Sequence, residues 1–192
     1  DGDSIRFYED MHVDHKRLSH EEAMQAIYIK GRDNARTPVQ WDASANAGFS
    51  PEGVTTWINV NPNYPAINAE AVLADEDSIF YHYQQLVALR RGELKDLMVY
   101  ASFAPVDSVQ VPHDEDEAVY AYTRTGGADG SPANESLLVI SNFTADELER
   151  DFAVLNEARE SGARVELVSS NYKDDAGSTL RPYEAKVYHI VR

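Results

Sequence analysis

The spacing of apolar residues changes near residue 97, and this change constrains the fold more than any other feature of the sequence. Residues 76–91 carry apolar side chains with a helical period and end on a basic turn before Gly92, which predicts a helix. Beyond residue 97 the apolar residues alternate, as they do in half-buried strands, and turn signals such as Asp129-Gly130 separate several segments. Strands are predicted at residues 98–103, 118–123, 136–141, 163–168 and 185–191, with a weaker one at 149–154. The second half is therefore predicted to be an antiparallel sheet or sandwich.

The first half combines a short helix with a long irregular segment. Ser19-His20-Glu21-Glu22 has the S-x-x-E form of a capping box, which predicts a helix that stops at Gly31. Residues 32–68 contain four prolines and many asparagines, which leave no room for a long regular element. Because the same segment holds four aromatic rings, among them Trp41 and Trp57, we expect a packed loop rather than a floppy one.

Composition excludes several classes of function. The 192 residues include 33 acidic and 17 basic side chains, a formal net charge of −16, and such a surface repels nucleic acid and anionic membranes. With 43% hydrophobic residues the chain is predicted to fold, and no apolar run approaches the ~20 residues of a membrane helix. Cysteine is absent from the sequence, which excludes disulfides and thiolate metal sites and favours a cytoplasmic location.

Most of the clusters that invite a chemical reading have a plainer explanation. Residues 10–15 gather two aspartates and two histidines, but a surface patch is favoured over a metal site because no rigid scaffold is evident. The acidic run at residues 113–117 is predicted to be a solvated turn, although crowded carboxylates are also typical of an acid catalyst or cation site. The glycosylation sequons at Asn134 and Asn142 are discounted as chance matches. We expect no metal and no cofactor.

Residues 30–42 concentrate hydrogen-bonding groups at the end of the predicted helix. Two guanidinium groups, two side-chain amides, carboxylates and a tryptophan ring suit a sugar, whose hydroxyls need paired donors and acceptors and whose C–H faces pack on aromatic rings. The alternative is that Arg32, Asp33 and Arg36 only hold the loop in place by ion pairs. The residues alone favour this structural alternative.

Six sequence blocks follow one another along most of the chain: GRDNARTPVQWD at residues 31–42, NAGFS at 46–50, WINVNPNY at 57–64, SIFYHY at 78–83, LRR at 89–91 and LRPYEAKVY at 180–188. In these blocks and their order the sequence resembles the C-terminal part of the α-glucosidases of glycoside hydrolase family thirteen, in the oligo-1,6-glucosidase and dextran glucosidase group. One departure is Val39, where the family more often has methionine, and such an apolar exchange is usually tolerated.

The resemblance implies a fold and an incomplete catalytic apparatus. Residues 1–97 are expected to be the C-terminal end of a (β/α)8 barrel and residues 98–192 a β-sandwich domain, so that the whole is an α+β fragment. A barrel needs about 250 residues and a sandwich about 100 more, and this chain is too short for both. The family's catalytic carboxylates are expected upstream, so no catalytic residue is assigned and the chain by itself is expected to be inactive. Residues 1–97 are expected to expose apolar surface that the missing N-terminal part of the barrel would cover.

The implied parent enzyme hydrolyses α-1,6 and other α-glucosidic bonds at the non-reducing end of short oligosaccharides, with retention of configuration. The expected partners are an isomaltose-like oligosaccharide and the missing barrel segment. The resemblance implies Arg32 as the first choice for a sugar contact, Arg36 as the second, and Asp33 as a residue that orients them.

Two alternatives remain. A sucrose isomerase or another transglucosylase of the same group would share these blocks. A non-catalytic β-sandwich that binds carbohydrate or protein would need an exposed aromatic platform, and Tyr120, Tyr122 and Tyr188 fit a core position equally well.

Overall fold

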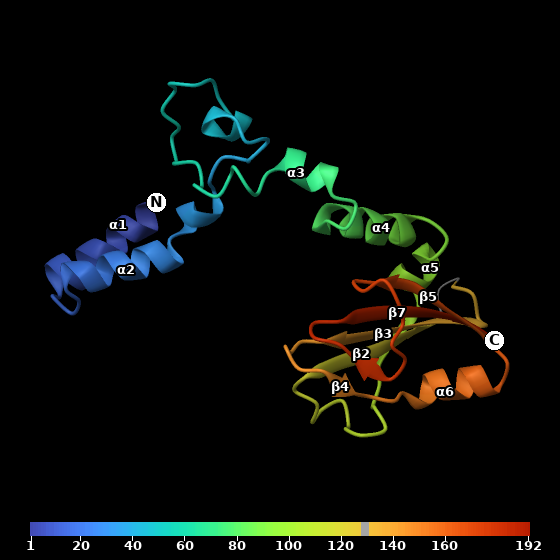
Figure 1. Cartoon of the computed structure of the whole chain (residues 1–192). Coiled ribbons are helices and arrows are strands. Elements are labelled where there is room, and N and C mark those ends of the chain that lie inside the picture. The colour runs from blue at the N-terminus through green and yellow to red at the C-terminus, as the bar shows by residue number, and fades with distance from the viewer. Residues whose placement is uncertain (128–130) are drawn as a thin grey trace. The chain divides into compact units, whose positions relative to one another are not determined.

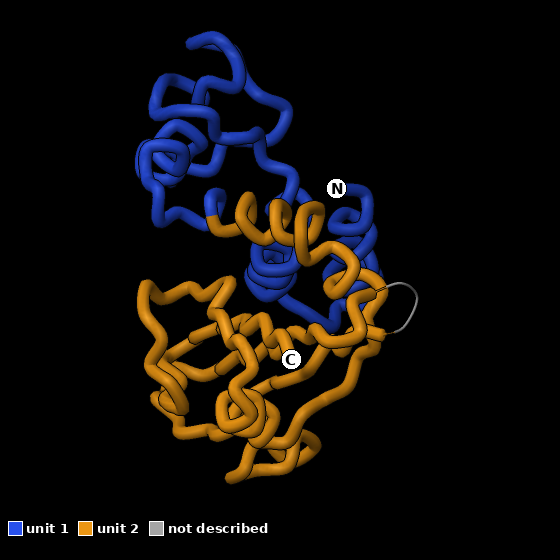
Figure 2. The backbone as a smooth tube through the Cα atoms, turned by 90° about the vertical axis from the view of Figure 1, so that its right-hand side faces the viewer, with its two compact units in different colours: residues 1–81 blue, residues 82–192 orange. Residues whose placement is uncertain are grey.

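The computed structural model describes residues 1–127 and 131–192, so the turn predicted at Asp129-Gly130 lies outside the described residues. The chain divides into two compact units, unit 1 at residues 1–81 and unit 2 at residues 82–192 (Figures 1 and 2). These units reflect contacts within this chain alone. The domain limits expected from the resemblance, residues 1–97 and 98–192, stay a prediction.

Unit 1 is built from short helices and loops. Helix α2 begins with the predicted capping box: the Ser19 hydroxyl accepts from the Glu22 N–H at 3.2 Å, and the Glu22 carboxylate accepts from the Ser19 N–H at 2.8 Å. The helix ends before Gly31, as predicted. The elements of unit 1 are α1 (Gly2–Tyr8), the π-helix η1 (Glu9–Asp14), α2 (His20–Lys30), the 3₁₀ helices η2 (Arg32–Ala35) and η3 (Ala45–Gly48), α3 (Ala69–Ala74) and the start of α4 (Ile79–Arg91).

Polar contacts rather than buried rings hold the long loop between η2 and α3. The Asn46 amide donates to Ser50 Oγ at 3.1 Å and to two carbonyl oxygens beyond it, and the Gln40 amide donates to Asn63 Oδ1 at 3.0 Å. Three of the four aromatic side chains, those of Trp41, Phe49 and Trp57, are exposed, Trp57 by 99%, and Tyr64 is half-buried. The expectation that these rings pack the loop was therefore wrong, because hydrogen bonds between amides and backbone supply the order instead.

Three successive left-handed residues shape the tip of this loop. Asn46, Ala47 and Gly48 have φ of 54°, 57° and 65°, and the Ala47 carbonyl accepts from the N–H groups of Trp41 and Asp42. A Cβ on Gly48 would lie 2.5 Å from the Asp42 carboxylate. Position 48 therefore requires glycine for space as well as for conformation.

Unit 2 contains a five-stranded antiparallel sheet with the strand order β1-β2-β3-β7-β5. A separate two-stranded ribbon pairs β4 with β6. The elements are the rest of α4, α5 (Lys95–Val99), β1 (Ser102–Pro105), β2 (Val119–Thr125), β3 (Glu135–Asn142), β4 (Leu148–Glu149), α6 (Ala153–Glu160), β5 (Arg164–Ser170), β6 (Thr179–Leu180) and β7 (Ala185–Val191).

The predicted helix at 76–91 is confirmed as α4, which starts three residues later than expected. Four strands fall where the alternation placed them, but two segments differ. Met98 and Val99 end helix α5, and β1 starts only at Ser102. The weak strand at 149–154 was wrong: a two-residue strand is followed by α6, because Phe152, Leu155 and Ala158 place apolar side chains at a helical spacing toward the core.

The core of unit 2 lies between one face of the sheet and a thinner second layer. Leu138, Ile140, Tyr188 and Ile190 of β3 and β7 pack against α6 and against Leu180 of the ribbon. This arrangement of helices followed by an antiparallel sheet confirms the predicted α+β class. The second layer of the expected sandwich consists of α6 and the short ribbon.

Among the described residues, the opposite face of the same sheet, which we call the outer face, is covered at one end. Leu94 and Leu97 at the start of α5, with Ala101, pack on Leu137 of β3, and Val187 of β7 is partly buried beside them. In the part of the chain that the structure describes, no helix is long and apolar enough to cross a membrane.

Candidate sugar-binding site

The three predicted site residues lie together immediately after α2. Gly31 ends the helix, and η2 carries Arg32 and Asp33, with Arg36 directly beyond it. The Asn34 side-chain amide donates to the Tyr28 carbonyl oxygen at 2.7 Å and ties this turn back to the helix. The segment is thus held to the end of α2 by this hydrogen bond.

Ion pairs join these residues to the start of α1. The Arg32 guanidinium donates to the Asp1 carboxylate through Nε at 3.1 Å and Nη2 at 2.8 Å, and it also pairs with Asp3. Asp33 accepts from the terminal amino group of Asp1 at 2.9 Å and lies 3.5 Å from Arg36 Nη1. The ion pairs that residue types alone favoured are therefore present, and Asp33 forms its arginine ion pair with Arg36 rather than with Arg32.

The carboxylates of this cluster are held in their ionised form. A hydrogen bond from Arg6 and the charge of Arg32 place the pKa of Asp3 below its ordinary value. Carboxylates with lowered pKa accept hydrogen bonds and hold cations, and they are poor proton donors near neutral pH.

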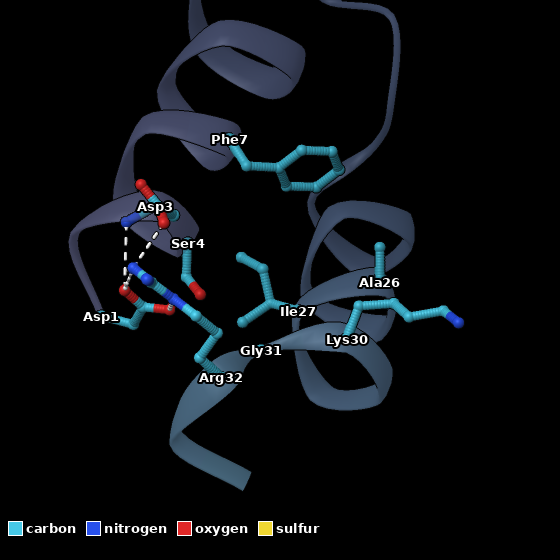
Figure 3. A pocket seen from close by; sticks show the side chains of 9 residues that line it. All are labelled: Asp1, Asp3, Ser4, Phe7, Ala26, Ile27, Lys30, Gly31 and Arg32. Atoms are coloured by element: carbon cyan, nitrogen blue, oxygen red, sulfur yellow. Dashed lines mark hydrogen bonds and ion pairs between the residues drawn. The ribbon is translucent and has the colours of Figure 1, made fainter. Parts of the chain in front are cut away.

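A cavity of about 290 Å³ adjoins Arg32 between α1 and α2 (Figure 3). Phe7, Ala26 and Ile27 give it an apolar side, while acidic and basic side chains lie at the end where Arg32 reaches Asp1 and Asp3. An apolar wall next to charged hydrogen-bonding groups suits a small amphiphilic ligand such as a sugar. The lining residues are Asp1, Asp3, Ser4, Phe7, Ala26, Ile27, Lys30, Gly31 and Arg32, and thus include neither Asp33 nor Arg36.

No local pattern in the sequence indicated the part of this site that α1 contributes. Asp1 and Asp3 precede the motif by about thirty residues, and only the packing of α1 beside α2 brings them to Arg32. The contact of Arg32, Asp33 and Arg36 with sugar stays a prediction.

The other clusters singled out in the sequence have structural contacts. His12 lies on η1 with Nδ1 3.0 Å from the Leu18 carbonyl oxygen, and His15 pairs with Asp10 at 3.1 Å. Asp116 pairs with Arg150 at 2.7 Å and accepts from two backbone N–H groups. Among residues 1–127 and 131–192, no three His, Cys, Asp or Glu side chains are placed to hold a metal ion.

Asn142, the acceptor residue of one sequon, is buried, and its amide is used inside the fold. Nδ2 donates to the carbonyl oxygens of Asp146 at 2.8 Å and Arg181 at 3.0 Å, and Oδ1 accepts from Thr144. The folded protein therefore offers no free amide nitrogen at this position.

A buried ionic cluster in unit 2 was missed by sequence reasoning. Lys186 is fully buried, and its Nζ donates to the carbonyl oxygens of Gly177 at 3.0 Å and Thr179 at 3.1 Å. Glu184, also fully buried, accepts from Arg181 Nη2 at 2.7 Å and from the Arg181 backbone N–H at 2.8 Å. The alternation of β7 would have revealed it, because Lys186 shares the inward face with Tyr188 and Ile190.

The pKa of Glu184 reflects a balance of opposing effects. Burial alone would raise the pKa of this carboxyl, but hydrogen bonds from Arg181 and the charge of Lys186 outweigh burial and hold it below its ordinary value. Glu184 is therefore ionised at neutral pH, and the polar atoms of the cluster have internal partners, as those of a structural ion pair do.

Comparison with known proteins places these features in a family. The family described as "Alpha amylase, catalytic domain" matches residues 2–100. The oligo-1,6-glucosidase of Bacillus cereus is 42% identical over 174 residues, which are 88% of this chain and 28% of that protein. The solved trehalose-6-phosphate hydrolase of Bacillus licheniformis has a TM-score of 0.78 at 34% identity, over 100% of this chain and 32% of its own. The isomaltulose synthase of Klebsiella sp. LX3 has a TM-score of 0.74 at 29% identity, over 99% of this chain and 31% of its own.

These matches agree on the part of the relatives to which the chain corresponds as well as on the type of protein. The chain spans 28–32% of the length of these relatives and aligns with the C-terminal third of the solved folds. The matched residues 2–100 are more than half of the chain and contain the Arg32 segment together with α4 and α5. The chain therefore belongs to the alpha-amylase family, glycoside hydrolase family thirteen.

Proposed function

We propose that this chain is the C-terminal part of a retaining α-glucosidase that hydrolyses α-1,6 and other α-glucosidic bonds at the non-reducing end of short oligosaccharides. The observation that carries the proposal is the 42% identity with an oligo-1,6-glucosidase across 88% of the chain. The acidic, cysteine-free composition also fits this proposal, because it argues against nucleic-acid binding, membrane binding and thiolate chemistry.

In this proposal the chain contributes substrate binding rather than the reacting carboxylates. Arg32 is the first choice for a hydrogen bond to a sugar hydroxyl, which it donates through Nη1 because Nε and Nη2 already bind Asp1. Arg36 is the second choice, and Asp33 orients it through the 3.5 Å ion pair. The apolar wall of Phe7 and Ile27 receives a sugar C–H face. The nucleophile and the general acid come from polypeptide that precedes these residues in the family fold.

The first test uses the 192-residue chain alone. Incubation with p-nitrophenyl α-glucoside is expected to release no p-nitrophenol, because the chain is proposed to lack both catalytic carboxylates. Release that exceeds the background, and that is lost when one carboxylate of the chain is replaced by its amide, would contradict this part of the proposal.

The second test restores the missing part. A chimera in which this chain replaces the matching region of the Bacillus cereus oligo-1,6-glucosidase is expected to hydrolyse isomaltose. Arg32→Ala is expected to lower its kcat/KM by roughly a hundredfold, since a charged hydrogen bond to substrate contributes about 3 kcal/mol at most. Arg17→Ala, which removes an exposed arginine elsewhere in unit 1, is the matched control and should leave kcat/KM unchanged. Full activity of Arg32→Ala would transfer the role to Arg36.

A second candidate is a sucrose isomerase of the same group. The likeness to isomaltulose synthase over 99% of the chain favours it specifically. Product analysis of the chimera on sucrose separates the two functions: glucose release from isomaltose supports the glucosidase, and isomaltulose as the main product from sucrose supports the isomerase.

A further inference from the structure

Acidic side chains outnumber basic ones by the same margin in both units. Unit 1 contains 14 acidic and 6 basic residues, and unit 2 contains 19 and 11, which is an excess of eight in each. Of the residues that the structure describes, 25 acidic and 13 basic ones are exposed. The excess is therefore a property of the whole surface rather than of one patch, so it does not have the outline of a single macromolecular partner.

Lysine is scarce on this surface. The chain has 5 lysines and 12 arginines, and because Lys186 is buried, four lysines are exposed beside the 25 acidic residues. Exposed arginines such as Arg6, Arg32 and Arg164 are engaged in ion pairs with individual carboxylates. The basic side chains thus neutralise only part of the acidic surface, and cations from the solution have to neutralise the rest.

Folding brings two acidic segments of unit 2 together. Arg150 Nε donates to Asp116 at 2.7 Å, and this ion pair joins residues 114–117 to residues 146–151. The Phe143 N–H donates to the Ala118 carbonyl oxygen at 2.8 Å and ties the same two stretches of chain. The two segments together hold eight carboxylates and Arg150 as their single basic side chain. The folded state therefore carries a repulsion that the unfolded chain largely avoids, since the segments separate on unfolding.

We propose that the surface of this chain is adapted to concentrated salt, and that its partner is a layer of hydrated monovalent cations such as K⁺ or Na⁺. Salt shortens the range of repulsion between exposed charges from about 10 Å at 0.1 M to about 3 Å at 1 M. Because the excess charge is spread over both units, the cations act by their concentration near the surface and not at one coordination site. The proposal does not depend on the proposed function, since it concerns folding stability.

Thermal unfolding of the 192-residue chain at pH 7, followed by circular dichroism, tests the proposal. Raising the KCl concentration from about 0.1 M to about 1 M is expected to raise the Tm by at least about 5 °C, because screening weakens a repulsion that is stronger in the folded chain. This shift should disappear near pH 4.6, the isoelectric point of the sequence, where the net charge is close to zero.

Two sixfold variants separate the effect of charge from other effects of salt. One replaces glutamate by glutamine at six exposed positions and changes the net charge from −16 to −10, and its matched control replaces the same glutamates by aspartate and keeps the charge. Because repulsion grows with the square of the net charge, the glutamine variant should show roughly half of the Tm shift or less, and the aspartate variant all of it. The six positions are Glu9, Glu52, Glu76, Glu115, Glu117 and Glu147.

Three outcomes would overturn the proposal. The first is a Tm that does not respond to KCl at pH 7. The second is an equal shift in the wild type and the glutamine variant, because salt would then act through the solvent and not through the charges. The third is a shift that millimolar MgCl₂ produces and KCl does not reproduce, which would replace the cation layer by a specific divalent site.

Folding of the isolated chain is itself informative. A chain that is folded in about 1 M KCl and unfolded in about 0.1 M would show the expected effect in its strongest form. If the chain is unfolded at both concentrations, the same comparison is made in the chimera with the Bacillus cereus glucosidase. The chimera with the native glutamates should then gain a larger Tm shift from KCl than the chimera with six glutamines, and equal shifts would refute the proposal.

Discussion

The two units of this chain bury very different side chains, although both contain many apolar residues. In residues 1–81, all of which are described, the buried residues are Ala23, Ala47 and Asn68, while tryptophan, tyrosine and isoleucine side chains are exposed. Unit 2 buries leucine, isoleucine, phenylalanine and tyrosine in one cluster between sheet and helix and another beneath α5. A region can therefore contain many apolar residues and still bury few of them. Of the two units, only unit 2 has a core that can support cooperative stability.

The largest expected loss of stability comes from the buried ionic cluster of unit 2, and it tests whether burial in this unit matters. Glu184→Gln is expected to lower the free energy of unfolding by about 3 kcal/mol at pH 7, because it removes the buried carboxylate that faces Lys186 and Arg181 and leaves them only their contacts with Asp175 and Asp174. Urea unfolding followed by far-UV circular dichroism measures the change. Glu160→Gln, on the exposed end of α6, is the matched control, and an equal loss there would contradict the role of burial.

The same variant predicts a pH dependence. The pKa of Glu184 in the folded protein lies below its value in the unfolded chain, so its contribution is complete above the unfolded pKa. That contribution is lost as the pH falls through the folded pKa. The difference in unfolding free energy between the wild type and Glu184→Gln should therefore shrink on acidification below about pH 4.3, and a difference that grows would refute the assignment.

The next prediction has a similar expected effect and compares a buried position in unit 2 with an exposed one in unit 1. If both respond alike, the contrast between the units fails. Leu138→Ala in β3 is expected to destabilise the protein by about 2–5 kcal/mol, because it empties a fully buried position. Ile29→Ala, a similar truncation on exposed α2, is expected to cost about 0.5 kcal/mol or less. Comparable losses in the two variants, measured by the same urea unfolding, would mean that unit 1 has a core of its own.

The smallest expected effect is local to unit 1. Ser19→Ala removes the side-chain acceptor of the α2 capping box and should cost about 1 kcal/mol of helix stability. Hydrogen exchange should quicken in the amides of α2 and stay unchanged in β3 and β7, because the core of unit 2 does not depend on this cap. Faster exchange in the strands as well would show that the units unfold together.

The sequence predicted those parts of the fold that rest on local signals. The Ser19 capping box, the basic end of α4 and the alternation of β7 depend on residues close together in the chain, and each was found. Helix α6 was missed because its apolar residues overlap a segment that also alternates. Tertiary contacts with the sheet decide between the two readings there.

The candidate site was predictable only in part for the same reason. Arg32, Asp33 and Arg36 were named because they stand in one contiguous motif that resembles the family's, and their contact with sugar stays a prediction. Their acidic partners Asp1 and Asp3, and the apolar wall that Phe7 adds, depend on how α1 packs beside α2, which no local pattern encodes.

The buried amide of Asn142 has a practical consequence for producing the protein. A secretory host attaches glycans to the Asn142-Phe143-Thr144 sequon while the chain is still unfolded, before Nδ2 reaches the Asp146 and Arg181 carbonyl oxygens. A glycan there would prevent the loop from closing, so yeast or mammalian secretion should yield misfolded material unless Thr144 is replaced. Expression in a compartment without the glycosylation machinery avoids the problem.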